Sequence, residues 1–172
     1  LSLDDFYIDR EERKKLSFSI NPLLATRGVP GTHNIKKILE IISKFDNSIY
    51  PLKIPIFDKL KDNSKKTKRI IRSKCDILIL EGWCLGCPPL TDKYLLSNIN
   101  FLEKNLDTNK NWRTYYNNQL KGVYSKLFNK FDISIFMKSP SFKHTCKWRL
   151  KQENQLIKKN ISSGMSKKEV LK

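Results

Sequence analysis

The nine residues from Cys75 to Trp83 constrain the fold more than any other stretch of the chain. Within them, the aliphatic run 77–80 ends abruptly in Glu81 and Gly82. A short apolar run of this kind predicts a strand buried on both faces, as in the middle of a parallel sheet. In open α/β sheets, ligands gather at the carboxyl ends of the strands. Glu81 therefore stands where a functional acid would stand, although a solvated acid at a strand end is an equally open alternative.

The charge of the chain is strongly positive. Among its 172 residues, 34 are Lys or Arg and 17 are Asp or Glu, so the net charge is +17. Such a field favours anionic partners. The basic residues are mostly Lys and accompany many Asn and Ile, which indicates a general bias in residue usage. We therefore expect part of the charge to be a solvated lysine surface, and charge alone does not favour a nucleic-acid partner.

Membrane and secreted classes are not expected. The chain has no run of about 18 apolar residues that could span a bilayer, so we expect no membrane partner. Its four cysteines come without a signal sequence, which indicates free thiols in a reducing compartment, and the cytoplasm is the expected location.

Strands and helices alternate along the chain. The pattern predicts helices over 10–19, 35–45, 91–103, 112–131 and 140–159, and a further helix that begins with a capping box at 166–169. It predicts buried strands at 77–80 and 132–137, an edge strand or a loop within 49–57, and a mobile polar segment over 58–74. This alternation predicts an α/β fold with a parallel sheet.

Acidic residues follow two of the expected strands. Asp4 and Asp5 come at the end of the first strand, and Glu81 ends the central one. Adjacent parallel strands would bring these carboxylates together, in a cluster suited to Mg²⁺ with waters and substrate phosphates. An acid there can also take the proton of a substrate hydroxyl in phosphoryl transfer. Acids that only cap loops are the alternative.

Other motifs carry less information. Cys84 and Cys87 have the C-x-x-C spacing, but no second pair at zinc-ligand spacing accompanies them. Neither His33 nor His144 has a neighbouring nucleophile that would suggest a hydrolase triad. The phosphate-binding motif G-x-x-x-x-G-K-[ST] does not occur in the 172 residues.

A set of segments carries a resemblance to a known family. These are LSLDDFY, REER, PLLATRGVPGTHN, IPIFDK and ILILEGWCLG, continued by NWRTYYNNQL, SPSF, WRLKQE and GMSKKEV. Together they resemble the D-glycerate 3-kinases of bacterial and plant type over nearly the whole chain. The TRGVPGTH and EGW combination is specific to that branch, whereas DDFY and LEG indicate only the wider superfamily of P-loop kinases.

The resemblance implies an ATP-dependent kinase. Its fold would be α/β, a three-layer P-loop NTPase-like kinase with a parallel central sheet. It would use ATP and Mg²⁺ to phosphorylate D-glycerate at the 3-hydroxyl, giving 3-phosphoglycerate. A related kinase acting on another small hydroxylated metabolite, such as a nucleoside or pantothenate, is the alternative within this class. A non-catalytic basic nucleic-acid-binding module is the alternative outside it.

The resemblance also implies catalytic and metal-binding roles. Asp4 matches the acid expected to act as general base beside Mg²⁺. Glu81 matches the acid that would hold Mg²⁺ through water. Arg149 falls in the lid-like helix, where such kinases carry cations over the transferring phosphoryl group.

Substrate contacts are expected from the irregular loop and from the acidic tip. Arg27 and His33 are the candidates for holding the carboxylate of D-glycerate, because a guanidinium fork can bind both carboxylate oxygens. Asp5 and Lys59 are further candidates for substrate contact, Lys59 being the weaker case.

The resemblance implies that residues 1–172 are a single kinase domain that is incomplete at both termini. The phosphate-binding loop would precede Leu1, and a strand would follow Lys172. The residues that bind ATP therefore stay unknown, and we do not expect the chain to turn over by itself. Its oligomeric state is not predicted.

Overall fold

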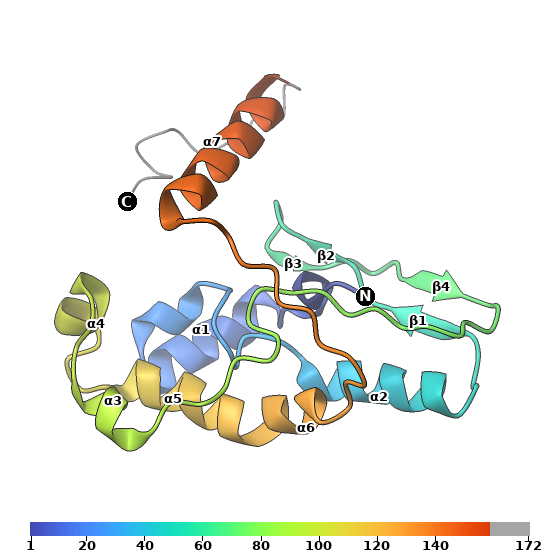
Figure 1. Ribbon diagram of the computed structural model, residues 1–172, viewed down its shortest axis with the longest axis horizontal. Coiled ribbons are helices and arrows are strands. Elements are labelled where there is room, and N and C mark those ends of the chain that lie inside the picture. Colours follow the sequence, from blue (N-terminus) through green and yellow to red (C-terminus); the bar gives the residue numbers. More distant parts are fainter. Residues whose placement is uncertain (159–172) are drawn as a thin grey trace. The chain divides into compact units, whose positions relative to one another are not determined.

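The computed structural model describes residues 1–158 of the chain as a mixture of helices and short strands (Figure 1). It divides into two compact units, Leu1–Asp132 and Ile133–Lys172. The capping box expected at 166–169 lies outside the described residues. None of the described helices is both long and apolar enough to cross a membrane.

The elements have the following bounds. In chain order they are the 3₁₀ turns Leu3–Phe6 and Pro22–Ala25 with α1 (Arg10–Ser19) between them, then α2 (Ile35–Asp46), β1 (Leu52–Ile54), β2 (Phe57–Asp58), β3 (Asn63–Ser64), β4 (Arg69–Ile71), α3 (Asp92–Leu96), α4 (Phe101–Leu106), α5 (Asn111–Gln119), the π-helical turn Leu120–Tyr124, α6 (Ser125–Phe128) and α7 (Phe142–Lys158).

The first two α-helices begin where the capping residues predict. Asp9 and Glu12 form the capping box of α1, in which the Asp9 amide donates to Glu12 Oε2 at 3.2 Å. The side chain of Asn34 accepts a hydrogen bond from the Lys37 amide at 3.0 Å and starts α2. Because these caps satisfy amides that have no partner within the helix, they fix both starting points. The predictions of 10–19 and 35–45 are confirmed.

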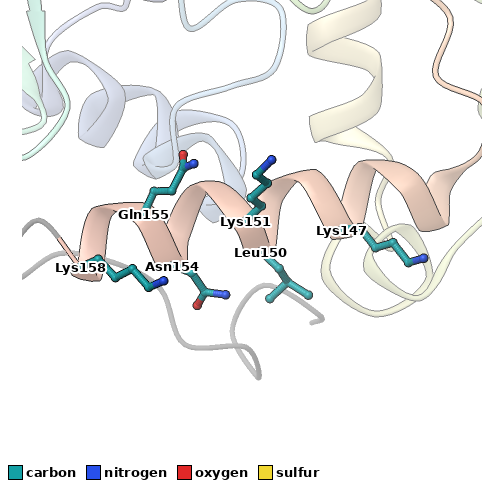
Figure 2. Close-up of a pocket in the computed structure, with 6 residues that line it drawn as sticks. All are labelled: Lys147, Leu150, Lys151, Asn154, Gln155 and Lys158. Carbon is teal, nitrogen blue, oxygen red and sulfur yellow. The ribbon is translucent and has the colours of Figure 1, made fainter.

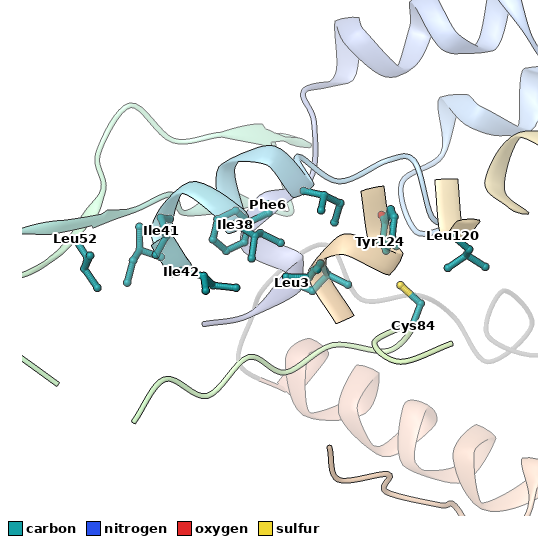
Figure 3. Close-up of a cluster of buried hydrophobic side chains, with 12 residues drawn as sticks. Leu3, Phe6, Ile38, Ile41, Ile42, Leu52, Cys84, Leu120 and Tyr124 are labelled. Carbon is teal, nitrogen blue, oxygen red and sulfur yellow. The ribbon is translucent and has the colours of Figure 1, made fainter. Parts of the chain in front are cut away.

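The core of the first unit surrounds α2 and the first 3₁₀ turn. The apolar face of α2 packs against β1 and α6, and Figure 3 shows its isoleucines beside Leu3 and Phe6. The buried set comprises Leu3, Phe6, Ile35, Ile38, Ile41, Ile42, Leu52, Ile54, Cys84, Leu120, Tyr124 and Leu127. Four isoleucines of α2, Ile35, Ile38, Ile41 and Ile42, thus form the face of the helix that lies in the core.

The sheets are small and antiparallel. β1 pairs with β4, and β2 pairs with β3. The segment 58–74, predicted to be polar and mobile, contains both β3 and β4. Cross-strand backbone hydrogen bonds, supported by the buried side chains of Leu52, Ile54 and Phe57, order a segment whose own residues are mostly polar.

The run 77–80 is not the doubly buried central strand that was predicted. Ile77 and Ile79 are 77% and 72% exposed, and only the alternate residues Leu78 and Leu80 pack on the core. Its one neighbour within residues 1–158 is the N-terminal segment, to which Glu81 is joined by an isolated parallel bridge at Ser2. With pairing on one side only, the outer face stays in solvent. A parallel sheet is not seen in the described part of the chain.

The second expected strand is also wrong for the described residues. In the segment 133–137, Ile133, Ile135, Phe136 and Met137 are between 82% and 91% exposed, and no strand is formed there. β-Propensity alone does not make a strand, because a strand also needs a hydrogen-bonding neighbour and a surface to pack on.

The helix expected over 91–103 is interrupted. α3 ends at Leu96, and the side chain of Asn100 accepts from the Glu103 amide at 2.8 Å to start α4. The turn between them is held by Arg113 of α5, which is 1% exposed. Its guanidinium donates to the Ser97 carbonyl at 3.1 Å, to Asn98 Oδ1 at 2.7 Å and to Asp107 Oδ2 at 2.9 Å. A buried guanidinium needs such partners, and they account for the break.

The helix expected over 112–131 forms but changes its winding. α5 passes through the π-helical turn Leu120–Tyr124 before α6 begins at Ser125. A π turn accommodates one residue more than the α-helical spacing and is commonly found at functional positions. Here it presents both Leu120 and Tyr124 to the buried core.

Gly82 packs so closely against Leu3 that a larger side chain should destabilise the fold. A β-carbon at position 82 would stand 2.6 Å from the β-carbon of Leu3, whereas one at Gly122 would meet nothing within 4 Å. We expect Gly82→Ala to lower the free energy of unfolding by about 1–3 kcal/mol through overpacking, as measured by urea denaturation. Gly122→Ala is the matched control and should be neutral or slightly stabilising, because alanine favours a helix. Equal stability of the Gly82 variant and the wild type would contradict this packing argument.

Candidate active site

The candidate site is built on a backbone pairing between the N-terminus and the segment that ends at Glu81. The Glu81 amide donates to the Leu1 carbonyl at 3.0 Å, and the Leu3 amide donates to the Glu81 carbonyl at 2.8 Å. Asp4 follows Leu3 directly, so its backbone lies beside that of Glu81. An isolated parallel bridge between Ser2 and Glu81 thus brings the two backbone segments together without a strand in either, and the shared carboxylate cluster stays a prediction.

Asp4 is flanked by a cation and by a phenol. Lys59 Nζ donates to Asp4 Oδ2 at 2.6 Å, and the Asp4 carboxylate is partly exposed. Burial, and then the negative charge of Asp4 and a hydrogen bond to it, raise the pKa of the Tyr7 hydroxyl well above its ordinary value. Asp4 and Lys59 are thus in direct contact, and Tyr7 stays protonated beside them as a donor.

Asp5 faces the neighbouring hairpin. Its Oδ1 accepts a hydrogen bond from the Phe57 amide at 3.2 Å, and its Oδ2 lies 3.8 Å from Arg69 Nη2. The carboxylate is therefore engaged by β2 and β4 and is mostly buried. In this arrangement it fixes the position of β2 beside the acidic tip.

Arg27, in the irregular loop, contacts the hairpin that carries Phe57 and Asp62. Its Nη1 donates to Asp62 Oδ1 at 2.6 Å, and its guanidinium carbon lies 5.7 Å from the centre of the Phe57 ring. Burial and Asp4 raise the pKa of Tyr7, and the positive charge of Arg27 acts in the opposite direction with a smaller effect, so this cation and Asp4 both act on the Tyr7 hydroxyl. The next residue of the loop, Gly28, accepts a hydrogen bond at its carbonyl from Trp83 Nε1 at 3.0 Å, which joins the TRGVPGTH loop to the EGW segment.

His33 is buried behind Tyr7. It is 6% exposed, its ring stacks on the Tyr7 ring at 4.4 Å, and its Nδ1 lies 2.6 Å from Tyr124 Oη. Burial lowers the pKa of His33 to about 4, while the Asp4 charge acts in the opposite direction. The imidazole is therefore neutral near pH 7. It does not face solvent as a cation that could hold a carboxylate, but supports Tyr7 from behind.

The loop between Arg27 and His33 is held by two tyrosines from α5 and the π turn. Tyr124 Oη accepts a hydrogen bond from the Gly31 amide at 3.1 Å, and Tyr115 Oη donates to the Gly31 carbonyl at 3.1 Å. Gly31 has φ of 98°, and a β-carbon there would stand 2.5 Å from the Tyr115 ring. Glycine is needed here for the backbone conformation and for the close approach.

Arg149 belongs to α7 in the second unit. Its Nη1 donates to Gln152 Oε1 at 3.0 Å, and its Nη2 lies 2.5 Å from Glu153 Oε1. A pocket of about 450 Å³ runs along the same helix (Figure 2). Its lining residues are Lys147, Leu150, Lys151, Asn154, Gln155 and Lys158. The three lysines give this part of α7 a positive surface.

The cysteines have no sign of metal or redox chemistry. All four have free thiols, and burial raises the pKa of the Cys84 thiol to about 12. A thiol in that state is neither a ready nucleophile nor a ready metal ligand. Across residues 1–158, no group of three or more His, Cys, Asp or Glu side chains could hold a metal ion.

The structure adds residues that the sequence did not single out. Tyr7 could have been suspected, since it lies two residues after Asp5. Asp62 and Phe57 bear on Arg27 only because β2 and β3 fold back toward α1, and the local sequence carries no signal of that contact. Tyr124 reaches His33 across 91 residues, and only the fold reveals it.

Comparisons with known proteins point to one group of enzymes. A comparison with descriptions of known protein families gave no match. The chain is 30% identical over 180 residues to a probable ATP-dependent kinase of Saccharomyces cerevisiae, and this alignment covers 98% of the chain and 60% of the yeast protein. It is 28% identical to the chloroplastic D-glycerate 3-kinase of Arabidopsis thaliana, with 99% of the chain and 37% of the plant protein covered.

A solved structure gives the same result. The fold is similar to that of D-glycerate 3-kinase from Cryptococcus neoformans var. grubii, with a TM-score of 0.82 and 27% identity, covering 99% of this chain and 63% of that one. The chain thus spans only about 60% of the length of the yeast and Cryptococcus relatives. The resemblance drawn from the sequence motifs is confirmed.

The buried state of His33 should make stability depend on pH. Because the folded protein binds a proton at His33 only near pH 4, whereas the unfolded chain does so near pH 6.5, stability falls as the pH is lowered through that range. We expect the wild type to lose about 2 kcal/mol more than His33→Asn between about pH 7 and about pH 5. Urea denaturation of both proteins at the two pH values measures this difference. Equal losses would show that His33 is not held neutral.

Proposed function

We propose that this chain, which is related to the glycerate kinase-like family, forms the acceptor side of an ATP-dependent kinase that phosphorylates D-glycerate at its 3-hydroxyl. The observation that carries the proposal is the ion pair between the partly exposed carboxylate of Asp4 and Lys59, with the charges of Asp4 and Arg27 both acting on the Tyr7 hydroxyl. A small acid with a hydroxyl group matches this arrangement of charges. The likeness to named D-glycerate 3-kinases supports the same substrate.

Asp4 would act as the general base. The 3-hydroxyl oxygen attacks the γ-phosphorus of ATP, a new P–O bond forms, and the bond from the γ-phosphorus to the bridging oxygen breaks to release ADP. The hydroxyl proton passes to the Asp4 carboxylate. Lys59 stands 2.6 Å from that carboxylate, where it can stabilise the negative charge of the phosphoryl group as the transfer proceeds.

The carboxylates present fit Mg²⁺ in the manner usual for kinases. Asp4 and Glu81 are both solvent-accessible, and Mg²⁺ usually keeps several waters and binds one or two carboxylates together with substrate phosphates. When bound, the ion would neutralise charge on the phosphates. Asp5 has both carboxylate oxygens turned to β2 and β4, so we assign it the support of Phe57 and leave the metal to the other two acids.

We assign the substrate carboxylate to Arg27. Its side chain is half-buried, it lies over Phe57, and a guanidinium binds a planar carboxylate through two parallel hydrogen bonds. His33 would hold the Tyr7 ring in place, acting through Tyr7 without touching the substrate. The cations of α7, Arg149 among them, are proposed to cover the transferring phosphoryl group, and a three-layer P-loop kinase fold with a parallel sheet is proposed for the whole protein.

The substrate assignment is tested by transfer from labelled ATP. The whole protein, of which residues 1–172 form the acceptor side, is purified for this and the following kinetic tests and is given D-glycerate, uridine and pantothenate in parallel. We expect label to pass to D-glycerate alone and to give 3-phosphoglycerate. Label on uridine or pantothenate with none on D-glycerate would refute the assignment while keeping the enzyme class.

Asp4→Asn should abolish most of the activity. The amide keeps an acceptor for Lys59 but cannot take the hydroxyl proton, so we expect kcat to fall by about 10²–10⁴-fold with little change in Tm. Steady-state kinetics with D-glycerate and thermal unfolding measure the two quantities. A kcat near that of the wild type would remove Asp4 from the role of base.

Lys59 and Lys61 lie in the same turn, so Lys61 can serve as the control for Lys59. Lys59 contacts Asp4, whereas Lys61 has no ion pair with any of the residues in the described range 1–158. We expect Lys59→Ala to lower kcat/KM by about 10-fold or more, and Lys61→Ala by less than about 2-fold. Neither should change Tm much, because exposed ion pairs add little stability. Equal effects of the two substitutions would mean that only the general positive charge of the turn matters.

A further inference from the structure

Asp62 joins two arginines that come from different parts of the first unit. Its Oδ2 forms an ion pair with Arg13 Nη2, and its Oδ1 accepts from Arg27 Nη1 at 2.6 Å. Each carboxylate oxygen therefore serves one guanidinium. The two arginines lie 14 residues apart along the chain, on α1 and on the irregular loop, and Asp62 reaches both from the β2–β3 hairpin.

The need of Arg13 for a counter-ion explains only one of the two ion pairs that Asp62 makes. Arg13 is completely buried, and it also donates to the Ile8 carbonyl at 2.5 Å and to the Ala25 carbonyl at 3.2 Å. A buried guanidinium needs a counter-ion, and Asp62 supplies it. The negative charge of Asp62 is thus balanced by Arg13, and the group of three retains the positive charge of Arg27.

Arg27 is left with donors to spare. Among the described residues its only hydrogen-bond partner is Asp62, at Nη1, so Nη2 and Nε have none there. The side chain is 31% exposed and lies over the Phe57 ring. A guanidinium held at one nitrogen and backed by an aromatic ring keeps a fixed direction, which reduces the entropy lost when an anion binds.

Asp62 is itself held firmly in position. It has φ of 55° at the end of the turn between β2 and β3. The residues that follow it are bound to the start of α1, since Asn63 Oδ1 accepts from the Arg10 amide at 2.9 Å and the Ser64 amide donates to Asp9 Oδ1 at 2.7 Å. The carboxylate is therefore a rigid support, as a positioning group requires.

We propose that Asp62 is a positioning residue that directs Arg27 toward the carboxylate of the substrate, and so sets the preference for an acidic acceptor. This inference rests on the proposed function, in which Arg27 binds that carboxylate. Asp62 does not touch the substrate and acts only through Arg27. Its substitution should therefore change substrate binding far more than the rate of transfer.

The test is a double-mutant cycle with Asp62→Asn and Arg27→Ala. We expect Asp62→Asn to raise KM for D-glycerate by about 10-fold, to change kcat by less than about 3-fold, and to leave KM for ATP unchanged. In the Arg27→Ala background it should add nothing further. Asp58→Asn, in the same hairpin, is the matched control and should behave as the wild type.

A purely structural role predicts a different result. In that case Asp62→Asn would change the kinetics by the same factor in both backgrounds, and this outcome would overturn the inference. A lower Tm is expected under either role, because Arg13 loses its counter-ion. If Asp62→Asn leaves Arg13 without a counter-ion and does not fold, Arg13→Met removes the buried charge. Asp62→Asn is then measured in that background, where it should still raise KM.

Binding of D-glycerate without ATP separates this inference from the proposed function. Isothermal titration of the wild type should give a dissociation constant that Asp62→Asn weakens by about 10-fold. Binding that is weakened in this way without any phosphoryl transfer would refute the proposed reaction and support the inference. Binding that Asp62→Asn leaves unchanged overturns the inference alone, and no binding by the wild type overturns both.

Discussion

The backbone pairing of the N-terminus with the residues up to Glu81 is the constraint on which the rest of the site depends. Three hydrogen bonds join two segments that are 78 residues apart in the chain. The backbone nitrogens of Leu1, Leu3 and Glu81 donate them to carbonyls of the opposite segment. The close contact of Leu3 with Gly82 sets how near they come. Asp4 has no other reason to lie beside Glu81, since the two acids belong to loops with unrelated sequences. The chemistry of the site is thus organised by main-chain geometry before any side chain is considered.

The charges around this pairing follow a consistent rule. Three carboxylates at the acidic tip and in the hairpin each meet at least one cation: Lys59 for Asp4, Arg69 for Asp5, and both Arg13 and Arg27 for Asp62. Because cations equal or outnumber the acids, an anion that approaches meets positive charge without having to displace a negative one. The excess of +17 over the whole chain adds a general attraction to that local effect. A phosphoryl donor and an acidic acceptor would both benefit.

Local sequence signals predicted where the first helices begin and which acidic residues belong to the candidate site. The strands and the contacts of Asp62 depend on pairing between distant segments. Asp9 and Asn34 are capping residues whose effect is confined to one turn, so α1 and α2 could be located from the sequence. The acids Asp4 and Glu81 could be brought together because parallel pairing relates strand ends in a simple way. By contrast, β2 and β3 have only two residues each, and they are held by their own pairing and by contacts with Asp5 and with the start of α1, which are distant in sequence. The runs 77–80 and 133–137 have strong β-propensity, yet neither forms a strand of a sheet among the described residues. Each lacks the neighbouring strands that a sheet requires, and many of its side chains are exposed. Asp62 could not be found from sequence at all, because its two partners lie 49 and 35 residues away.

The π turn Leu120–Tyr124 has a consequence for how relatives are compared. In the π turn, each backbone hydrogen bond spans one residue more than it does in an α-helix. This helix therefore contains one residue more than a regular α-helix of the same length. A relative whose helix is regular throughout would therefore need a one-residue gap between Gln119 and Ser125. Without that gap, the position of Tyr124 would be matched to a residue turned by about 100° around the helix axis, away from His33. The tyrosine that holds the Gly31 loop would then seem to be missing from proteins that in fact possess it.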